Sequence, residues 1–237
     1  MKDNLQRHAP GPTLRRLALY HSVLVQLVKN GREVVSCTRI GEELRFDPTQ
    51  VRKDIEATGI VGKSRIGYEV RPLVDAIEDF LGWNNTTEAF LVGAGALGTA
   101  LLGYERFPAC GLSIVAAFDR DPLKVGRPVH DKEVLPMEKF TDLARRMIIR
   151  MGIITVPAES AQNVADTMVA AGIRAIWNFA PVILTVPPSV IVEEVQLASS
   201  LAVLSSKLAR TLKLEKKKEE LPDDNDTTEP AARHAKV

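Results

Sequence analysis

The sequence predicts an α/β protein in which a small, mainly helical domain precedes a doubly wound parallel sheet. Three observations support this fold class. Residues 1–70 hold three short amphipathic segments and then a glycine-rich stretch. From residue 85 onward, short and fully apolar runs alternate with helical stretches, as in a sheet whose two faces are both buried. One of these runs leads into a glycine-rich loop, Leu91-Val92-Gly93-Ala94-Gly95-Ala96-Leu97-Gly98.

The N-terminal segment is expected to form three helices and a hairpin. Apolar residues recur at helical spacing over residues 14–27, and an Asn-Gly pair then ends that helix. Residues 36–44 form a second helix with a serine at its N-cap, and residues 47–57 form a third that opens with Asp-Pro. The stretch 60–70 has glycines among β-branched residues, which predicts a glycine-turned hairpin. Three helices followed by a hairpin is the order of a winged-helix domain.

The remaining elements follow from the same two patterns. Residues 72–81 form one more helix, and the polar segment 82–87 separates the two domains. We expect buried strands at 89–92, 112–118, 147–156 and 173–179, and helices at 97–104, 137–146, 158–171 and 190–214. Residues 1–12 are expected to be flexible, and residues 215–237, which are rich in charge, to be disordered.

Composition places the chain among cytoplasmic proteins without disulfides or zinc. Cys37 and Cys110 are the only cysteines, and neither has other metal ligands near it in the sequence. No run of 18 or more apolar residues occurs, so we expect no membrane span. The net charge is +1, but residues 1–68 hold twelve Lys and Arg against seven Asp and Glu. This basic excess either attracts phosphates or is a solvated face, and composition alone leaves both open.

The glycine loop has the spacing G-x-G-x-x-G between a strand and a helix, as a dinucleotide site requires. Gly93 permits the tight turn, Gly95 lets the backbone approach a pyrophosphate, and Gly98 lets the helix pack on the strand. Asp119 follows Gly98 by about 20 residues, where a carboxylate accepts hydrogen bonds from the adenosine ribose. An acid there repels a 2′-phosphate and favours NAD over NADP, a preference that the adjacent Arg120 weakens. The alternative is a glycine turn that holds no ligand.

Two later turns follow strands whose carboxyl ends share the same edge of the sheet. Thr155-Val156-Pro157 and Asn178-Phe179-Ala180-Pro181 are expected to line a nicotinamide pocket, although ordinary strand-ending turns have the same spacing. None of the four histidines follows a core strand, so the general acid or base that a hydride-transfer enzyme needs is not evident. We therefore expect a binding protein with no catalytic residue and no metal site.

Six motifs, spread over both domains, occur together in one order. They are Thr49-Gln50-Val51-Arg52-Lys53-Asp54, Ile66-Gly67-Tyr68, the glycine loop, Phe118-Asp119, Ile154-Thr155-Val156-Pro157-Ala158 and Asn178-Phe179-Ala180-Pro181-Val182. This set closely resembles the Rex family of redox-sensing transcriptional repressors, over about residues 10–208. The resemblance implies a winged helix at 13–84, a Rossmann domain that binds NAD(H) at 85–190, and a homodimer that exchanges the helix 191–214 between its subunits. It also implies that the protein binds palindromic operator DNA when NAD⁺ dominates and releases it when NADH binds.

The resemblance also assigns site residues. The cofactor would be bound by Gly93, Ala94, Gly95, Ala96, Leu97, Gly98, Tyr104, Asp119, Arg120, Thr155, Val156, Pro157, Asn178, Phe179, Ala180 and Pro181. The DNA would be bound by Arg16, Ser36, Thr49, Gln50, Arg52, Lys53, Lys63, Arg65 and Tyr68. On a recognition helix in the major groove, Gln50 is suited to adenine edges and Arg52 or Lys53 to guanine or phosphate. Lys63 and Arg65 on the hairpin would contact the minor groove or the backbone.

The chain departs from the family pattern at two positions that bear on redox sensing. In family members an arginine of the first helix can pair with an aspartate at the start of the exchanged helix, whereas this chain has Ser22 and Gln196 there. Losing both partners predicts a weaker discrimination between NADH and NAD⁺. Two alternatives stay open: a small NAD-dependent oxidoreductase whose N-terminal domain only dimerises it, and a related regulator that does not respond to redox state.

Overall fold

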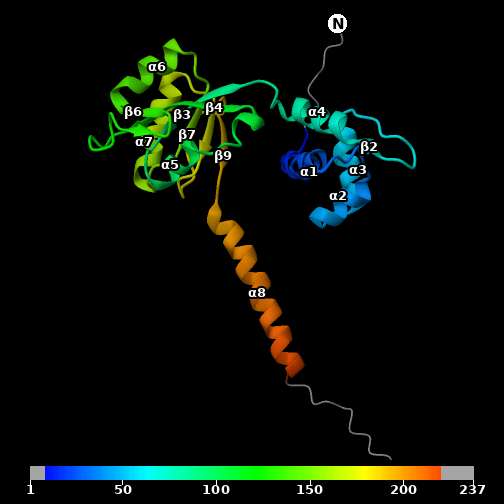
Figure 1. Cartoon of the computed structure of the whole chain (residues 1–237). Helices are drawn as coiled ribbons and strands as arrows, with labels where there is room; N and C mark the ends of the chain where they lie inside the picture. Colours follow the sequence, from blue (N-terminus) through cyan, green and yellow to red (C-terminus); the bar gives the residue numbers. More distant parts are fainter. Residues whose placement is uncertain (1–8, 220–237) are drawn as a thin grey trace, which may run out of the picture. The chain divides into compact units, whose positions relative to one another are not determined.

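The first part of the computed structural model is a helical domain with its own core (Figure 1). The structure describes residues 9–219. In chain order, the elements of this domain are α1 (Gly11–Lys29), β1 (Val34–Val35), α2 (Cys37–Leu44), α3 (Pro48–Ala57), β2 (Tyr68–Glu69) and α4 (Val70–Leu81). Apolar side chains from all four helices meet in one buried cluster that includes Leu17, Leu24, Ile40, Val51, Ile55, Leu73 and Ile77. The four predicted helices are thus confirmed, with α1 longer than expected at both ends.

The predicted caps set the starts of α2 and α3. The hydroxyl of Ser36 accepts a hydrogen bond of 3.1 Å from the backbone N–H of Arg39. The carboxylate of Asp47 accepts hydrogen bonds from the backbone N–H groups of Thr49 and Gln50, at 2.7 and 3.3 Å. These bonds satisfy donors that the helix itself leaves unpaired, so both helices begin where the capping pattern predicts.

The expected hairpin over residues 60–70 is only partly present. Its chain reversal is a turn with a single bridge between Lys63 and Gly67, whereas β2 pairs with β1 and so with the segment before α2. Most of the residues at 61–66 are exposed, so no apolar face holds a second strand there. Gly67, at φ +103°, permits the observed pairing because a Cβ at this position would lie 2.2 Å from the carbonyl oxygen of Val35.

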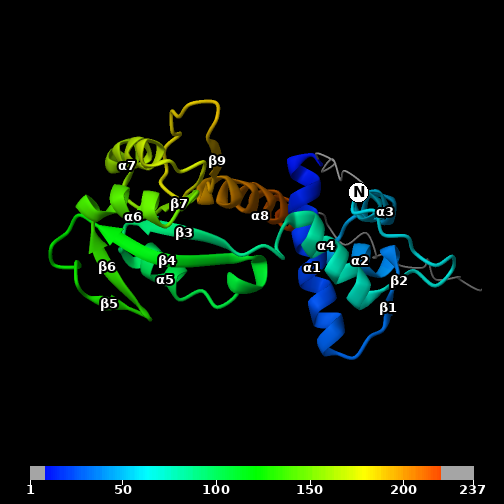
Figure 2. The same cartoon turned by 90° about the horizontal axis from the view of Figure 1, so that it is seen from above.

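The second domain is built on a seven-stranded sheet with helices on both faces (Figure 2). Its elements are β3 (Thr87–Val92), α5 (Ala96–Leu102), β4 (Leu112–Asp119), β5 (Pro128–Val129), β6 (Lys132–Pro136), α6 (Phe140–Arg146), β7 (Met151–Ile154), α7 (Ala158–Ala171), β8 (Ala175–Asn178) and β9 (Ile191–Glu194). Short 3₁₀ turns at Pro108–Cys110 and Met137–Lys139 precede β4 and α6. The strand order is β5-β6-β4-β3-β7-β8-β9, and the five strands from β6 to β8 are parallel. The predicted doubly wound sheet is therefore present.

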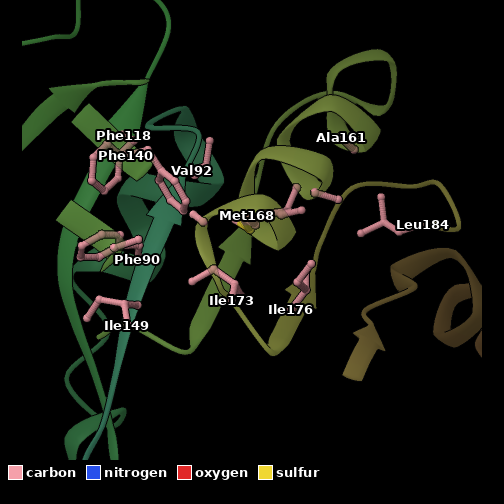
Figure 3. Packing of buried hydrophobic residues seen from close by; sticks show 14 of the residues in the cluster. Phe90, Val92, Phe118, Phe140, Ile149, Ala161, Met168, Ile173, Ile176 and Leu184 are labelled. Carbon is pink, nitrogen blue, oxygen red and sulfur yellow. The ribbon is translucent and has the colours of Figure 1, made fainter. Parts of the chain in front are cut away.

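The central strands bury both of their faces, which explains why they are apolar throughout. Along β3, Phe90 and Val92 pack under α6 and α7, while Ala89 and Leu91 pack toward α5. In Figure 3, Phe90 lies beside Phe118 of β4 and Phe140 of α6. The ring centroids of these three residues are 4.9 to 5.6 Å apart, within the range of favourable aromatic contacts.

Several predicted boundaries are wrong. The strand expected at 147–156 is only Met151–Ile154, and the hairpin of β5 and β6 was not predicted. The helix expected from 190 begins instead at Leu197, as α8 (Leu197–Glu219), and β9 takes its first residues. The β-branched residues Ile191 and Val192 favour a strand, but the helical spacing of the leucines that follow predicted a helix for the whole segment.

Two expectations for the termini are corrected in part, because residues 11–12 belong to α1 and residues 215–219 to α8. The remainder, residues 1–8 and 220–237, lies outside the described residues.

The described residues up to Glu193 belong to one compact unit, and those from Glu194 onward belong to a second. Among the described residues, most of the second unit is α8, whose leucines at positions 197, 201, 204, 208 and 212 are all exposed. That spacing places them on one face of the helix. Among the described helices, none is both long and apolar enough to cross a membrane.

Candidate functional site

A cavity of about 930 Å³ lies at the carboxyl edge of the sheet. It is bordered by the loop after β3, the end of β4, the turn after β7 and the turn after β8. This edge is where parallel α/β sheets bind their ligands. The lining residues are Val92, Gly93, Gly95, Leu97, Asp119, Arg120, Asp121, Lys124, Met137, Thr155, Val156, Pro157, Ser160, Asn163, Val164, Thr167, Phe179 and Pro181.

The three loop glycines play different structural roles. Gly93 has φ +108°, and a Cβ there would lie 2.8 Å from the backbone of Thr155. A Cβ on Gly98 would lie 1.9 Å from the carbonyl oxygen of Gly93, so helix and loop approach as closely as only glycine allows. A Cβ on Gly95 would meet none of the described residues within 4 Å. Gly95 is therefore open toward the cavity, as a loop that approaches a pyrophosphate must be.

The carboxylate of Asp119 ties the glycine loop to the end of β4. Its Oδ2 accepts hydrogen bonds from the backbone N–H of Ala94 at 2.8 Å and from Nζ of Lys124 at 3.0 Å, and its Oδ1 accepts one from the N–H of Asp121 at 2.9 Å. Burial, at 7% exposure, would raise the pKa of Asp119, but these donors outweigh it and hold the pKa below its ordinary value. Asp119 is thus an ionised acceptor at the cavity wall.

Ten of the sixteen expected cofactor residues line this cavity. Ala94, Ala96, Gly98, Asn178 and Ala180 belong to the same loops but do not line it. Asn178 is fully buried and donates from Nδ2 to the carbonyl oxygen of Val182, so it shapes the turn after β8. Tyr104 does not line this cavity within the single chain but lines a separate one beside Phe107 and Trp83.

A polar face of α7 and one lysine also line the cavity, and neither was predicted from the sequence as part of the site. Ser160, Asn163 and Thr167 line the cavity and recur at helical spacing, a signal that the sequence contains. Lys124 lies in the loop after β4, where no periodicity identifies it. Its contact with Asp119 follows only from the turn that Asp119 and Asp121 cap.

A second cavity, of about 770 Å³, lies between α3 and the turn at 60–67. Six of the expected DNA-binding residues line it, and five of these are exposed: Ser36, Thr49, Arg52, Lys63 and Arg65. Tyr68, the sixth, is largely buried, so its ring belongs to the wall of the groove. Gln50 and Lys53 are exposed on α3 outside the groove lining. The helix and the turn together present a basic surface.

Arg16, the last of the expected DNA-binding residues, is partly buried and paired within the domain. Its Nε and Nη2 donate to the two carboxylate oxygens of Asp54 at 2.6 and 2.8 Å, and its side chain is 21% exposed. These bonds raise the pKa of Arg16 above its ordinary value despite the opposing effect of burial. This bidentate pair, together with a bond from Nη2 to the hydroxyl of Thr13, engages Nε and Nη2 of the guanidinium. Arg16 therefore links α1 to α3.

Two sequence families match the chain. The family described as "CoA binding domain" matches residues 84–182, the region of the sheet and its glycine loop. The family described as "Putative DNA-binding protein N-terminus" matches residues 8–55, which include α1, α2 and most of α3. The DNA-binding match thus falls on the N-terminal helical domain, and the other match falls on the sheet domain that follows it.

The chain is also similar to named repressors and to solved structures. The redox-sensing transcriptional repressor Rex of Treponema denticola is 45% identical over 199 residues, which cover 84% of this chain and 95% of that protein. The repressor of the same name from Bacteroides fragilis is 42% identical over 84% of this chain and 90% of its own. RSP in complex with beta-NADH has a TM-score of 0.80 and 34% identity, over 88% of this chain and 98% of RSP. RSP in complex with beta-NAD+ and operator DNA has a TM-score of 0.79 and 35% identity, over 90% and 99%.

Proposed function

Because the chain belongs to the Rex family of redox-sensing transcriptional repressors, we propose that it binds operator DNA, senses the ratio of NADH to NAD⁺, and releases the DNA when NADH binds. One observation carries this function: a single chain holds both a cavity at a dinucleotide-type glycine loop and a basic groove beside a capped helix. The protein is a regulator rather than an enzyme, as its relatives are named. Since it needs both operator DNA and the NADH pool, we propose that it acts in the cytoplasm.

In this proposal NAD(H) occupies the cavity at the carboxyl edge of the sheet. The open backbone at Gly95 approaches the pyrophosphate, and Asp119 accepts hydrogen bonds from the adenosine ribose. Oδ1 of Asp119 has one protein donor, so it keeps acceptor capacity for a ribose hydroxyl. The turns at Thr155 and Phe179 would enclose the nicotinamide. The solved complexes of RSP with beta-NADH and with beta-NAD+ support this choice of ligand.

The DNA would be bound by α3 in the major groove and by the turn at 60–67 beside it. Thr49, Gln50, Arg52 and Lys53 are exposed on α3, so they can reach base edges or phosphates. Lys63 is held by Glu69 at 2.5 Å, an exposed pair that solvent screens and that a phosphate can replace. The solved complex of RSP with operator DNA supports DNA as a ligand of this chain.

We propose that the repressor is a homodimer joined through α8. The exposed apolar face of this helix needs a partner in water, and a second copy of the same face is self-complementary. A dimer presents two recognition helices, which matches a palindromic operator. NADH would change the spacing of these helices only if it contacts the two dimer states differently. With Ser22 and Gln196 in place of the family's charged pair, we expect a smaller difference between NADH and NAD⁺.

The proposed function is tested by a gel-shift titration at fixed salt, because phosphate contacts make affinity steeply salt-dependent. The operator is selected by the protein from random-sequence duplexes in the presence of NAD⁺. The proposal requires that NADH weakens binding to the selected duplex and that NAD⁺ does not. Equal affinity at saturating NADH and NAD⁺ would instead indicate a regulator that does not respond to redox state. If the selection enriches no duplex sequence, the chain does not recognise an operator and the proposed repressor function is rejected.

A further inference from the structure

Asp54 lies on the recognition helix α3, yet it is 2% exposed. Its carboxylate accepts four hydrogen bonds. Oδ2 accepts from Nε of Arg16 at 2.6 Å and from the hydroxyl of Tyr20 at 2.8 Å. Oδ1 accepts from Nη2 of Arg16 at 2.8 Å and from Nε2 of Gln50 at 3.0 Å. One buried group thus connects α1 to an exposed residue one turn earlier on α3.

These hydrogen bonds favour the ionised form of the Asp54 carboxyl group. Burial alone would raise its pKa, but the hydrogen bonds from Arg16, Tyr20 and Gln50 outweigh burial and lower it. Burial, together with the hydrogen bond to Asp54, raises the pKa of the Tyr20 hydroxyl, so that hydroxyl stays a donor. Asp54 is therefore a carboxylate that only accepts hydrogen bonds, and Arg16 of α1 binds both of its oxygens.

An acceptor-only partner decides which way the amide of Gln50 faces. An exposed glutamine amide is free to flip, which exchanges the positions of its oxygen and its nitrogen. The carboxylate of Asp54 accepts a hydrogen bond from Nε2 but repels Oε1, so only one of the two orientations keeps the 3.0 Å contact. In that orientation Oε1 and the second N–H of Nε2 remain available for another partner. One acceptor and one donor, side by side, are what the major-groove edge of adenine requires.

We propose that Asp54 is a positioning residue for sequence recognition: it fixes the amide of Gln50 so that α3 discriminates one base pair of the operator. Asp54 itself contacts no DNA, because it is buried beneath the helix. A purely structural role explains the network less well, since a buried ion pair often stabilises a fold no more than apolar side chains of the same volume. The inference rests on the proposed function, which supplies the operator.

The experiment measures a specificity profile rather than affinity alone. Full-length protein is titrated with the selected operator and with a set of duplexes that each carry one substituted base pair. Gln50→Ala identifies the base pair that Gln50 contacts, because discrimination there falls by about tenfold or more. Asp54→Asn is expected to lose discrimination at that same base pair and to retain it elsewhere. The double variant is expected to lose no more there than Gln50→Ala does.

Tyr20→Phe is the matched control. It removes one hydrogen bond to Oδ2 of Asp54 but leaves the contact between Oδ1 and Gln50 in place. It is expected to lower the thermal midpoint while keeping discrimination at the Gln50 base pair. If Asp54→Asn weakens binding equally for every duplex, or if Tyr20→Phe loses the same base pair, Asp54 is structural and the inference is wrong.

A measurement on the wild-type protein covers the case in which Asp54→Asn does not fold or no operator is found. Side-chain ¹⁵N relaxation of the DNA-free protein compares Nε2 of Gln50 with Nε2 of Gln26, a glutamine that is exposed on α1. The inference requires that the Gln50 amide is ordered like the helix backbone. A Gln50 amide as mobile as that of Gln26 overturns it. Selection of no operator sequence, by contrast, would count against the proposed function.

Discussion

Substitution of Gly95 by alanine separates the two roles that the glycine loop combines. Gly95 has φ −82° and ψ −168°, a conformation that alanine adopts without strain. Since a Cβ there meets none of the described residues within 4 Å, Gly95→Ala is expected to change the free energy of unfolding by less than about 0.5 kcal/mol. The same methyl group would occupy the space through which the loop approaches the pyrophosphate. Losing one hydrogen bond to a charged group costs about 1.5–3 kcal/mol, so NADH binding should weaken about tenfold to a hundredfold.

Gly98→Ala is the matched comparison, because its Cβ would lie 1.9 Å from the carbonyl oxygen of Gly93. The loop must then move by about 1 Å, an overpacking that costs roughly 1–3 kcal/mol. This variant should therefore lose several degrees of thermal midpoint as well as NADH affinity. The assays are thermal unfolding of the apo-protein and a titration followed by NADH fluorescence. A Gly95→Ala protein that binds NADH as tightly as the wild type would refute the assignment of the cavity.

Three further predictions concern acid stability, assembly and redox discrimination. The lowered pKa of Asp54 contributes stability above the ordinary aspartate pKa of about 4, and this contribution is lost as the pH falls through the lower folded-state value. Urea unfolding of Asp54→Asn should accordingly depend less on pH below about 4 than unfolding of the wild type. Joint substitution of Leu204 and Leu208 by glutamate should yield monomers in sedimentation velocity, and persisting dimers would exclude the α8 interface. Joint substitution Ser22→Arg and Gln196→Asp should widen the affinity ratio of NADH to NAD⁺ in calorimetry, and an unchanged ratio would show that these positions are not coupled to the cofactor.

Local patterns predicted the parts of the fold that depend on neighbouring residues. Ser36 and Asp47 begin their helices because a cap needs only the next three residues. The apolar runs of β3 and β4 identified buried parallel strands because both faces of these strands are covered. The glycine spacing and Asp119 also located the cavity correctly, because the loop after β3 and the end of the next strand, β4, form part of its wall.

Features that depend on distant partners could not be predicted. The pairing of β2 with β1 joins segments that α2, α3 and the turn at 60–67 separate in the sequence, and nothing in residues 60–70 reveals it. The helical spacing of α1 predicts that Arg16 is exposed and free to bind a phosphate, but its guanidinium donates to Asp54, which lies on another helix. Tyr104 was assigned through the family resemblance, and within this chain its ring packs against Phe107, with the ring centroids 4.7 Å apart.

The three hydrogen bonds that hold Asp119 in place bear on which part of the cofactor allows the protein to distinguish NADH from NAD⁺. In the proposed binding mode, Asp119 and the glycine loop contact the adenosine and pyrophosphate half of the dinucleotide, which is chemically identical in NADH and NAD⁺. Contacts to that shared half are the same for NADH and for NAD⁺, so they cannot make the two ligands shift the conformational equilibrium differently, however strong they are. The free-energy difference that drives release of the DNA therefore originates at the nicotinamide half, where a positively charged aromatic ring becomes a neutral dihydropyridine ring, in the proposal beside the turns that follow β7 and β8.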